Sequence, residues 1–274
     1  MTERVVKRMT DNQRILNVTG GRNFRELGGY RTIDGHTVKW HKLLRTAGLA
    51  ELTPEDQQML SNYGVVADVD FRSKDEQAQS PDRVPAGVTY HFLPVFPADD
   101  QTDASASEAD LQKRFSSDGQ AGHNHMVDVY RQMVTLDSAQ SAYHDFFATL
   151  LANEDEQQSV LFHCTAGKDR TGMGAFFVLS ALGVDPQTIR QDYLMTNETS
   201  AEHIKLVTAD ALKKGYGEAF ASNIRALYSV SNDYFDAANK IINTQYGGTQ
   251  DYLKDVLGLS HSDLTNLKQL YLDA

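Results

Sequence analysis

Residues 159–182 read SVLFHCTAGKDRTGMGAFFVLSAL, and this stretch decides the fold. Its first five residues, Ser159 to His163, are a short apolar run of the kind that forms a buried strand. From Thr171 to Leu182 the chain is apolar at helical length, and Gly183 supplies a stop signal. We therefore expect residues 163–171 to form a loop that connects the end of a strand to the start of a helix.

This loop places a cysteine and an arginine in a position suited to phosphate chemistry. Cys164 follows the strand and Arg170 begins the helix, with five residues between them. Such a loop can direct its backbone N–H groups at a tetrahedral anion, and the helix N-terminus adds partial positive charge. The same groups favour a thiolate, which makes Cys164 the predicted nucleophile. Arg170 is predicted to hold two phosphoryl oxygens through its planar set of donors.

Other loop residues have predicted supporting roles. Asp169 is the candidate acid for the leaving group, although an aspartate in a first helical turn is also simply a favourable charge. Lys168 is either a substrate contact or a surface charge. The Thr171 hydroxyl is expected to donate to the sulfur, and His163 to stabilise the loop. The predicted phosphate-binding loop comprises His163, Thr165, Ala166, Gly167, Lys168, Thr171 and Gly172.

The sequence on either side of the loop alternates between strand and helix signals. Short β-branched runs at 65–71 and 88–93 predict two further strands, and turn signals within 23–49 predict a β-rich entry. Thr53-Pro54 and Gly64 bracket a predicted helix at 54–63. Helical spacing predicts two helices within 126–153, with a restart near Asp137.

These elements predict the fold class as α/β. We expect a single domain over residues 1–274, with a central, mostly parallel sheet flanked by helices and a helical C-terminal part at 198–274. Residues 97–124 are rich in Asp, Ser, Ala, Gln and Gly and predict an irregular polar insertion.

Composition excludes several function classes. The formal net charge is −11 without a basic run, which argues against nucleic acid as a partner. One cysteine rules out an internal disulfide and a multi-cysteine zinc site. The sequence shows neither a signal peptide nor a transmembrane segment, so the cytoplasm is the default expectation, with release from the cell without a signal left open. His123, His125 and Asp128 have metal-like spacing but no third ligand motif, and solvated histidines are expected there.

The loop His-Cys-Thr-Ala-Gly-Lys-Asp-Arg-Thr-Gly at 163–172 resembles the signature of cysteine phosphatases, and specifically of the bacterial tyrosine-protein phosphatase family. Four other segments resemble recurring segments of that family in the same order: 23–30 (NFRELGGY), 44–49 (LRTAGL), 70–73 (DFRS) and 192–197 (DYLMTN). Glu26 and Phe71 depart from the residues the family commonly has, and neither is expected to touch the loop.

The resemblance implies a phosphate monoester hydrolase that needs no cofactor or metal. By position it implies that Cys164 is the nucleophile, Arg170 the phosphate ligand and Asp169 the acid, with Asp70 in a supporting role. It implies a phosphotyrosine protein or a phosphoinositide as substrate, with Lys168 as the candidate contact to a second phosphate. The alternative from another class is a binding module that captures a phosphorylated partner without turning it over.

Overall fold

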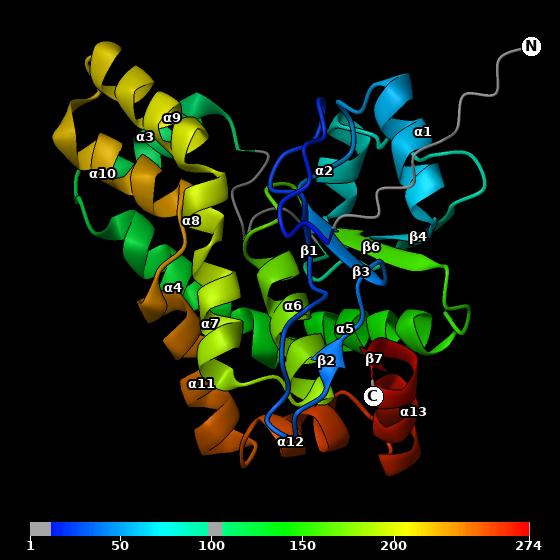
Figure 1. Ribbon diagram of the computed structural model, residues 1–274. Helices are drawn as coiled ribbons and strands as arrows, with labels where there is room; N and C mark the ends of the chain where they lie inside the picture. Colours follow the sequence, from blue (N-terminus) through cyan, green and yellow to red (C-terminus); the bar gives the residue numbers. More distant parts are fainter. Residues whose placement is uncertain (1–11, 98–105, 274) are drawn as a thin grey trace, which may run out of the picture.

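A five-stranded sheet lies at the centre of the computed structural model, which describes residues 12–97 and 106–273 (Figure 1). The strand order is β1-β3-β6-β4-β5. Strands β3, β6, β4 and β5 are parallel to their neighbours, and only β1 pairs antiparallel, with β3. The strands are β1 (Arg25–Glu26), β3 (Leu43–Thr46), β4 (Val65–Asp70), β5 (Thr89–Phe92) and β6 (Ser159–His163). Because parallel strands end at the same edge of a sheet, segments that follow β3, β4 and β6 meet there.

The central strand β6 shows why both faces of the sheet are covered. Leu161 packs on one side with Leu44 and Leu60, the latter from α1. Val160 and Phe162 point to the other side and join the main core with residues of α5 and α6. Figure 1 shows α1 and α2 on one side of the sheet and α5 and α6 on the other. These helices are α1 (Pro54–Tyr63), α2 (Lys74–Gln79), α5 (Asp137–Leu151) and α6 (Arg170–Leu182).

Of the remaining helices, α7, α12 and α13 pack against α6, and the others extend away from the sheet. Figure 1 shows α9, α10 and α3 grouped at one end of the molecule, joined to the rest through α4 and α8. The bounds are α3 (Glu108–Phe115), α4 (Ala121–Thr135), α7 (Pro186–Leu194), α8 (Thr196–Thr199), α9 (Ala201–Lys213), α10 (Gly217–Tyr228), α11 (Asn232–Gln245), α12 (Thr249–Asp251), the π-helical turn η2 (Tyr252–Val256) and α13 (His261–Tyr271). A small second sheet pairs β2 (Thr37–Val38) with β7 (Leu272–Asp273).

The structure confirms the predicted fold class, and several predicted elements coincide with observed ones. Helix α1 begins after the N-cap Thr53, whose side chain accepts a hydrogen bond from the Asp56 backbone, and ends at Gly64 with φ of 103°. The two helices predicted in 126–153 are α4 and α5, separated at Leu136.

The prediction of an irregular segment at 97–124 was wrong over much of its length. Residues 98–105 lie outside the described part, but residues 108–115 form α3 and α4 begins at Ala121. Helix α3 is stabilised by two apolar side chains, Leu111 and Phe115, which pack against Phe220 and Ile224 of α10. A local sequence window cannot reveal a helix whose apolar face depends on a partner about a hundred residues away.

Within residues 12–97 and 106–273, every helix is too short or too polar to cross a membrane.

Candidate active site

The loop between β6 and α6 depends on a glycine at its tightest point. Gly167 has φ of 65°, a left-handed conformation that side-chain-bearing residues rarely adopt. A Cβ atom there would lie 2.3 Å from the Thr46 carbonyl oxygen, so the loop packs directly against the end of β3. Gly172, one turn into α6, is similarly confined, since its Cβ would lie 3.3 Å from the Tyr193 ring.

The carbonyl groups of residues 163–167 all have partners, and four of the five are bound by residues outside the loop. The His163 oxygen accepts from the Phe71 N–H at 2.9 Å, and the Thr165 oxygen accepts from the Gly48 N–H at 3.2 Å. The Cys164 oxygen lies 3.2 Å from Nδ1 of the His163 ring. The carbonyl oxygens of residues 166 and 167 accept from the Asn23 amide at 3.2 Å and 2.9 Å.

The backbone N–H groups of residues 165–168, unlike the carbonyl groups, lack hydrogen-bond partners among the described residues. With the carbonyls held outward, the N–H groups are free to face an anion beside Cys164. The loop therefore presents unpartnered donors of the kind that suit an anion.

A buried ion-pair network holds the outer side of the loop in place. Arg45 donates to the Gly167 carbonyl at 3.0 Å and pairs with Asp192 at 2.6 Å. Arg25 also pairs with Asp192, at 3.3 Å, and donates to the side chain of Asn23. Burial alone would raise the pKa of Asp192, but Arg25 and Arg45 lower it. The segments at 23–30, 44–49 and 192–197, which resemble recurring family segments, thus meet behind the loop.

Cys164 is buried at the end of β6 and has the features of a nucleophile. Burial would raise the pKa of its thiol, but Arg170 and the neighbouring Thr171 more than offset this, and the pKa is lowered. The Thr171 hydroxyl is buried and has no hydrogen-bond partner in the described chain. A hydroxyl that interacts with the sulfur favours the thiolate and can stabilise it as a leaving group.

Arg170 is fixed by a carboxylate that the sequence analysis missed. Its two terminal nitrogens donate to the two carboxylate oxygens of Glu76, at 2.5 Å and 2.7 Å. Burial would raise the pKa of Glu76, but Arg170 and Thr165 lower it to about 2. The Arg170 Nε atom is buried without a hydrogen-bond partner among the described residues, which leaves it available for a ligand.

A sequence signal for part of this arrangement existed. Ser73-Lys74-Asp75-Glu76 is a capping box, in which Ser73 accepts from the Glu76 backbone and Glu76 accepts from the Ser73 backbone. The pattern could have predicted the start of α2. It could not have predicted that the same carboxylate reaches Arg170, which is 94 residues away in the chain.

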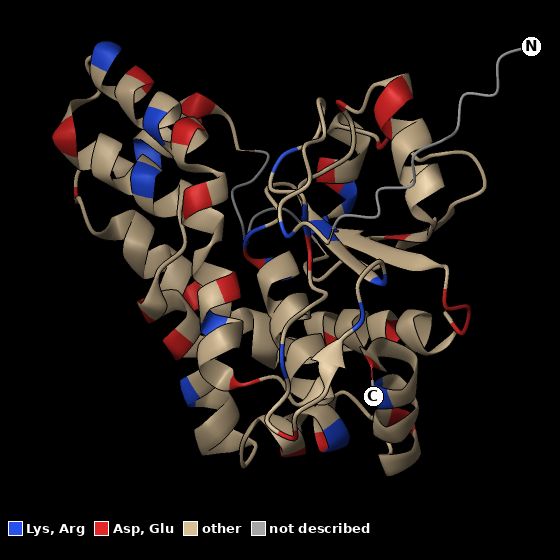
Figure 2. Ribbon diagram, viewed as in Figure 1, with Lys and Arg blue, Asp and Glu red and all other residues tan. Residues whose placement is uncertain are grey.

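Asp169 lies at the N-terminal end of α6 but does not cap it. Its side chain makes no cap hydrogen bond. Instead Oδ1 accepts from the Tyr130 hydroxyl at 2.8 Å, and Oδ2 pairs with Lys168 at 2.6 Å. Helix α6 has no charged residue after Arg170, and Figure 2 shows the charges gathered where the helix begins. Asp169 therefore makes no capping hydrogen bond, while its charge still lies at the N-terminus of α6, where a negative charge is favourable.

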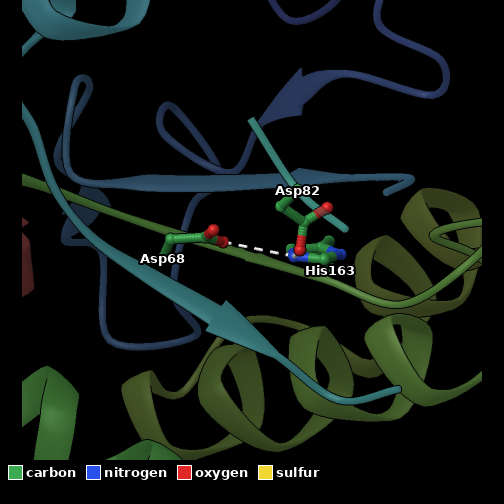
Figure 3. A group of neighbouring side chains, drawn as sticks. All are labelled: Asp68, Asp82 and His163. Carbon is green, nitrogen blue, oxygen red and sulfur yellow. Dashed lines mark ion pairs between the residues drawn. The ribbon is translucent and has the colours of Figure 1, made fainter. Parts of the chain in front are cut away.

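Asp70 and His163 lie beneath the loop in a buried charged cluster. Arg72 donates to Asp70 through its backbone and side chain, at 2.7–3.0 Å, and Tyr90 donates at 2.7 Å. His163 Nε2 lies 3.2 Å from Asp68 and 3.4 Å from Asp82 (Figure 3). Burial would lower the pKa of His163, but Asp70 and Asp68 raise it well above its ordinary value.

Asp68, Asp82 and His163 have ligand atoms within 4.8 Å of one another, which invites a test as a metal site. The charges present argue against this assignment. Arg72 already pairs with both Asp70 and Asp82, so a positive charge lies beside the carboxylate that a cation would need. We assign the cluster to holding His163, whose ring in turn contacts the Cys164 carbonyl.

The other histidines considered as ligands do not converge. His123 faces Asp233 at 3.0 Å, Asp128 pairs with Arg131 at 2.8 Å, and the His125 ring packs near Phe115.

The Glu26 carboxylate binds the His41 and Gly28 backbone and the Tyr63 hydroxyl, away from the loop. The Phe71 side chain packs in the core, but its backbone N–H does bind the His163 carbonyl, so the expectation that it lies clear of the loop was wrong in this respect.

A cavity of about 620 Å³ opens over the loop. Cys164, Thr165, Ala166, Lys168, Asp169 and Arg170 line its floor together with Arg22, Asn23 and His203. Apolar side chains of α3, α4 and α10 line another part, including Leu111, Met126, Val129 and Leu227. The cavity therefore combines a floor of polar and charged loop residues with apolar walls.

Comparisons with known proteins find a matching family and similar proteins. Residues 16–273 match the model of a family described as the tyrosine phosphatase family. The chain is 30% identical to the triple specificity protein phosphatase PtpB of Mycobacterium tuberculosis, over 94% of this chain and 99% of that protein. It is 31% identical to a tyrosine-protein phosphatase of Nostoc commune, over 82% of this chain and 72% of that protein.

Proposed function

The chain belongs to the tyrosine phosphatase family, and from this premise we propose that it hydrolyses phosphate monoesters through a phosphocysteine on Cys164. The observation that carries the proposal is the set of unpartnered donors around the sulfur. The N–H groups of residues 165–168 and the Arg170 Nε atom have no partner among the described residues. Donors held in this way suit the oxygens of a phosphoryl group.

In the first step, the Cys164 thiolate attacks phosphorus and an S–P bond forms. The P–O bond to the leaving group breaks at the same time, and Asp169 in its acid form gives its proton to the departing oxygen. Arg170 and the loop N–H groups take up charge on the three remaining phosphoryl oxygens. The released alcohol or phenol leaves a phosphocysteine and an ionised Asp169.

In the second step, water attacks phosphorus while Asp169 accepts one of its protons. The S–P bond breaks, inorganic phosphate forms, and the thiolate is restored. The Thr171 hydroxyl is suited to stabilise the departing sulfur, because it is buried near the end of the loop and has no hydrogen-bond partner in the described chain. Asp169 ends the cycle protonated, ready for the next substrate.

We propose phosphotyrosine proteins as substrates, with phosphoinositides as a second class. The cavity volume supports both, because about 620 Å³ exceeds what a single phosphate needs. Lys168, at the cavity floor, is the proposed contact to a second phosphate, for which it would have to leave Asp169. The relative from Mycobacterium tuberculosis bears the description triple specificity, which is consistent with a broad substrate range.

Asp169→Asn tests the proposed acid. General acid catalysis contributes about 10²–10⁴-fold, and it matters most when the leaving group is a poor one. We expect the variant to lose about that factor with phosphotyrosine peptides and much less with an aryl phosphate whose phenol is strongly acidic. Steady-state phosphate release for both substrates, with chelator present, measures the difference.

The wild-type protein measured with the same substrates provides the reference, and phosphoinositide vesicles extend the series to the second class. Equal losses for good and poor leaving groups would assign the acid to another carboxylate. Turnover that vanishes with chelator and returns with a divalent cation would contradict the metal-free mechanism.

A further inference from the structure

The two carboxylate oxygens of Asp169 lie in different surroundings. Oδ2 pairs with Lys168, and both of these residues line the cavity. Oδ1 accepts a hydrogen bond from the hydroxyl of Tyr130, which is completely buried and is not part of the cavity lining. One oxygen is therefore held by a residue of the cavity lining and the other by a residue of the protein interior.

The Tyr130 hydroxyl is itself oriented by a second tyrosine. The Tyr193 hydroxyl lies 2.9 Å from the Tyr130 hydroxyl and 3.2 Å from the Ser231 carbonyl. A hydroxyl has one hydrogen to donate. The Ser231 carbonyl can only accept, so it competes with the Tyr130 oxygen for the hydrogen of Tyr193, and the Tyr130 oxygen is the nearer acceptor. With Tyr193 donating to Tyr130, the hydrogen of Tyr130 is left for Asp169, and the chain runs from Tyr193 through Tyr130 to Oδ1.

Both tyrosines are locked in place and stay protonated. Tyr193 on α7 packs edge-on against Tyr130 on α4, with ring centroids 6.0 Å apart, and it also contacts Phe235 and the backbone at Gly172. Burial, followed by the nearby charge of Asp169, raises the pKa of both hydroxyls well above the ordinary value. They act as hydrogen-bond donors throughout the working pH range and not as proton sources.

We propose that Tyr130 and Tyr193 are positioning residues that reserve Oδ1 of Asp169 as an acceptor, so that the catalytic proton is carried on Oδ2 facing the substrate. This inference rests on the proposed function and adds the device that orients its acid. Tyr130 fixes the carboxyl plane, and Tyr193 fixes the direction of the Tyr130 hydroxyl. Neither residue touches the phosphoryl group.

Several charged and titratable groups surround Asp169 besides these tyrosines. The loop and α6 contribute Lys168, Cys164 and Arg170, while α4, α5 and α11 contribute His125, Tyr143 and Tyr234. All of them remain in a Tyr130→Phe variant. A change in the pH profile of that variant therefore reports the lost hydroxyl.

The test compares Tyr130→Phe, Tyr193→Phe and Tyr234→Phe by rate against pH, using aryl phosphates with good and poor leaving groups. A hydrogen bond to a charged group corresponds to about 10- to 100-fold in rate. We expect Tyr130→Phe to lose about that factor on the poor leaving group only. Its basic limb should move to higher pH, because a donor that favours the ionised carboxylate is gone. Tyr193→Phe should show a smaller change in the same direction.

Tyr234→Phe is the matched control. The Tyr234 ring also packs against Tyr130, with centroids 5.7 Å apart, but its hydroxyl donates to the Ala226 carbonyl and not toward Asp169. We expect this variant to keep the wild-type profile. The position of a pH limb does not depend on the fraction of active protein, so partial unfolding of a variant cannot mimic the shift.

A double-mutant cycle with Asp169→Asn separates the possible failures. If Tyr130 acts through Asp169, Tyr130→Phe should cause no further loss in the Asp169→Asn background. Two results would overturn the positioning role while leaving the proposed function intact. One is a double variant whose rate loss equals the product of the two single losses, and the other is a Tyr130→Phe profile whose basic limb stays at the wild-type pH. If Asp169→Asn alone keeps the wild-type leaving-group dependence and basic limb, the acid of the proposed function is wrong and the positioning role falls with it.

Discussion

A Cys164→Ser variant is expected to lose turnover by at least about 10⁴-fold, because removing an enzymic nucleophile typically costs that much or more. A serine hydroxyl in this site would not be ionised at neutral pH, whereas Arg170 and Thr171 lower the pKa of the Cys164 thiol. Phosphate release from phosphotyrosine peptides measures the loss. Binding of the same peptide should survive, because the loop N–H groups and Arg170 are unchanged.

The two halves of that result distinguish the enzyme from the binding-module alternative. An enzyme loses turnover and keeps binding, whereas a module that only captures phosphate changes little in either measurement. Serine differs from cysteine by one atom, and Cys164 is buried, so thermal unfolding should be compared to confirm the fold. Retained turnover in a folded Cys164→Ser protein would contradict the proposed nucleophile.

Arg170→Lys should produce the second large loss, about 10²–10³-fold in kcat, the range seen when a donor to transition-state charge is removed. Lysine keeps the positive charge but cannot bind Glu76 with two nitrogens and also present a donor such as Nε to the phosphoryl group. Single-turnover kinetics with a phosphotyrosine peptide would measure the chemical step directly.

Glu76→Gln is the informative companion to that variant. It retains one acceptor for Arg170 and for Thr165, so the loss should be smaller than in Arg170→Lys. A loss as large as that of Arg170→Lys would mean that the carboxylate charge, and not the shape of the arginine, sets the rate. No loss in Arg170→Lys would contradict the proposed role of the guanidinium.

The central sheet and its loop could be predicted because their signals are local. The apolar run at 159–163, the glycine-bearing loop and the apolar helix follow one another without interruption, and the N-cap Thr53 and Gly64 bound α1 at the predicted residues. Helix α3 was missed because it is stabilised by packing against α10. Strand β7 was missed because its partner β2 lies near the other end of the sequence.

The same distinction applies to the site. The residues inside the loop share one motif, so their grouping was predictable from spacing alone. Glu76, Tyr130 and Tyr193 reach the loop from α2, α4 and α7, and no spacing rule connects them to Asp169 or Arg170. Arg45 and Asp192 stand within segments that resemble the family, but only the fold shows that they bind the back of the loop.

The most direct test of the account is to trap the covalent intermediate. The Asp169→Asn protein is mixed with an aryl phosphate that has a good leaving group, quenched within milliseconds to seconds, digested, and analysed by mass spectrometry. We predict a phosphoryl group on the peptide that contains Cys164, formed at a rate no slower than steady-state turnover. Turnover without such an adduct, or an adduct on a different residue, would contradict the phosphocysteine mechanism.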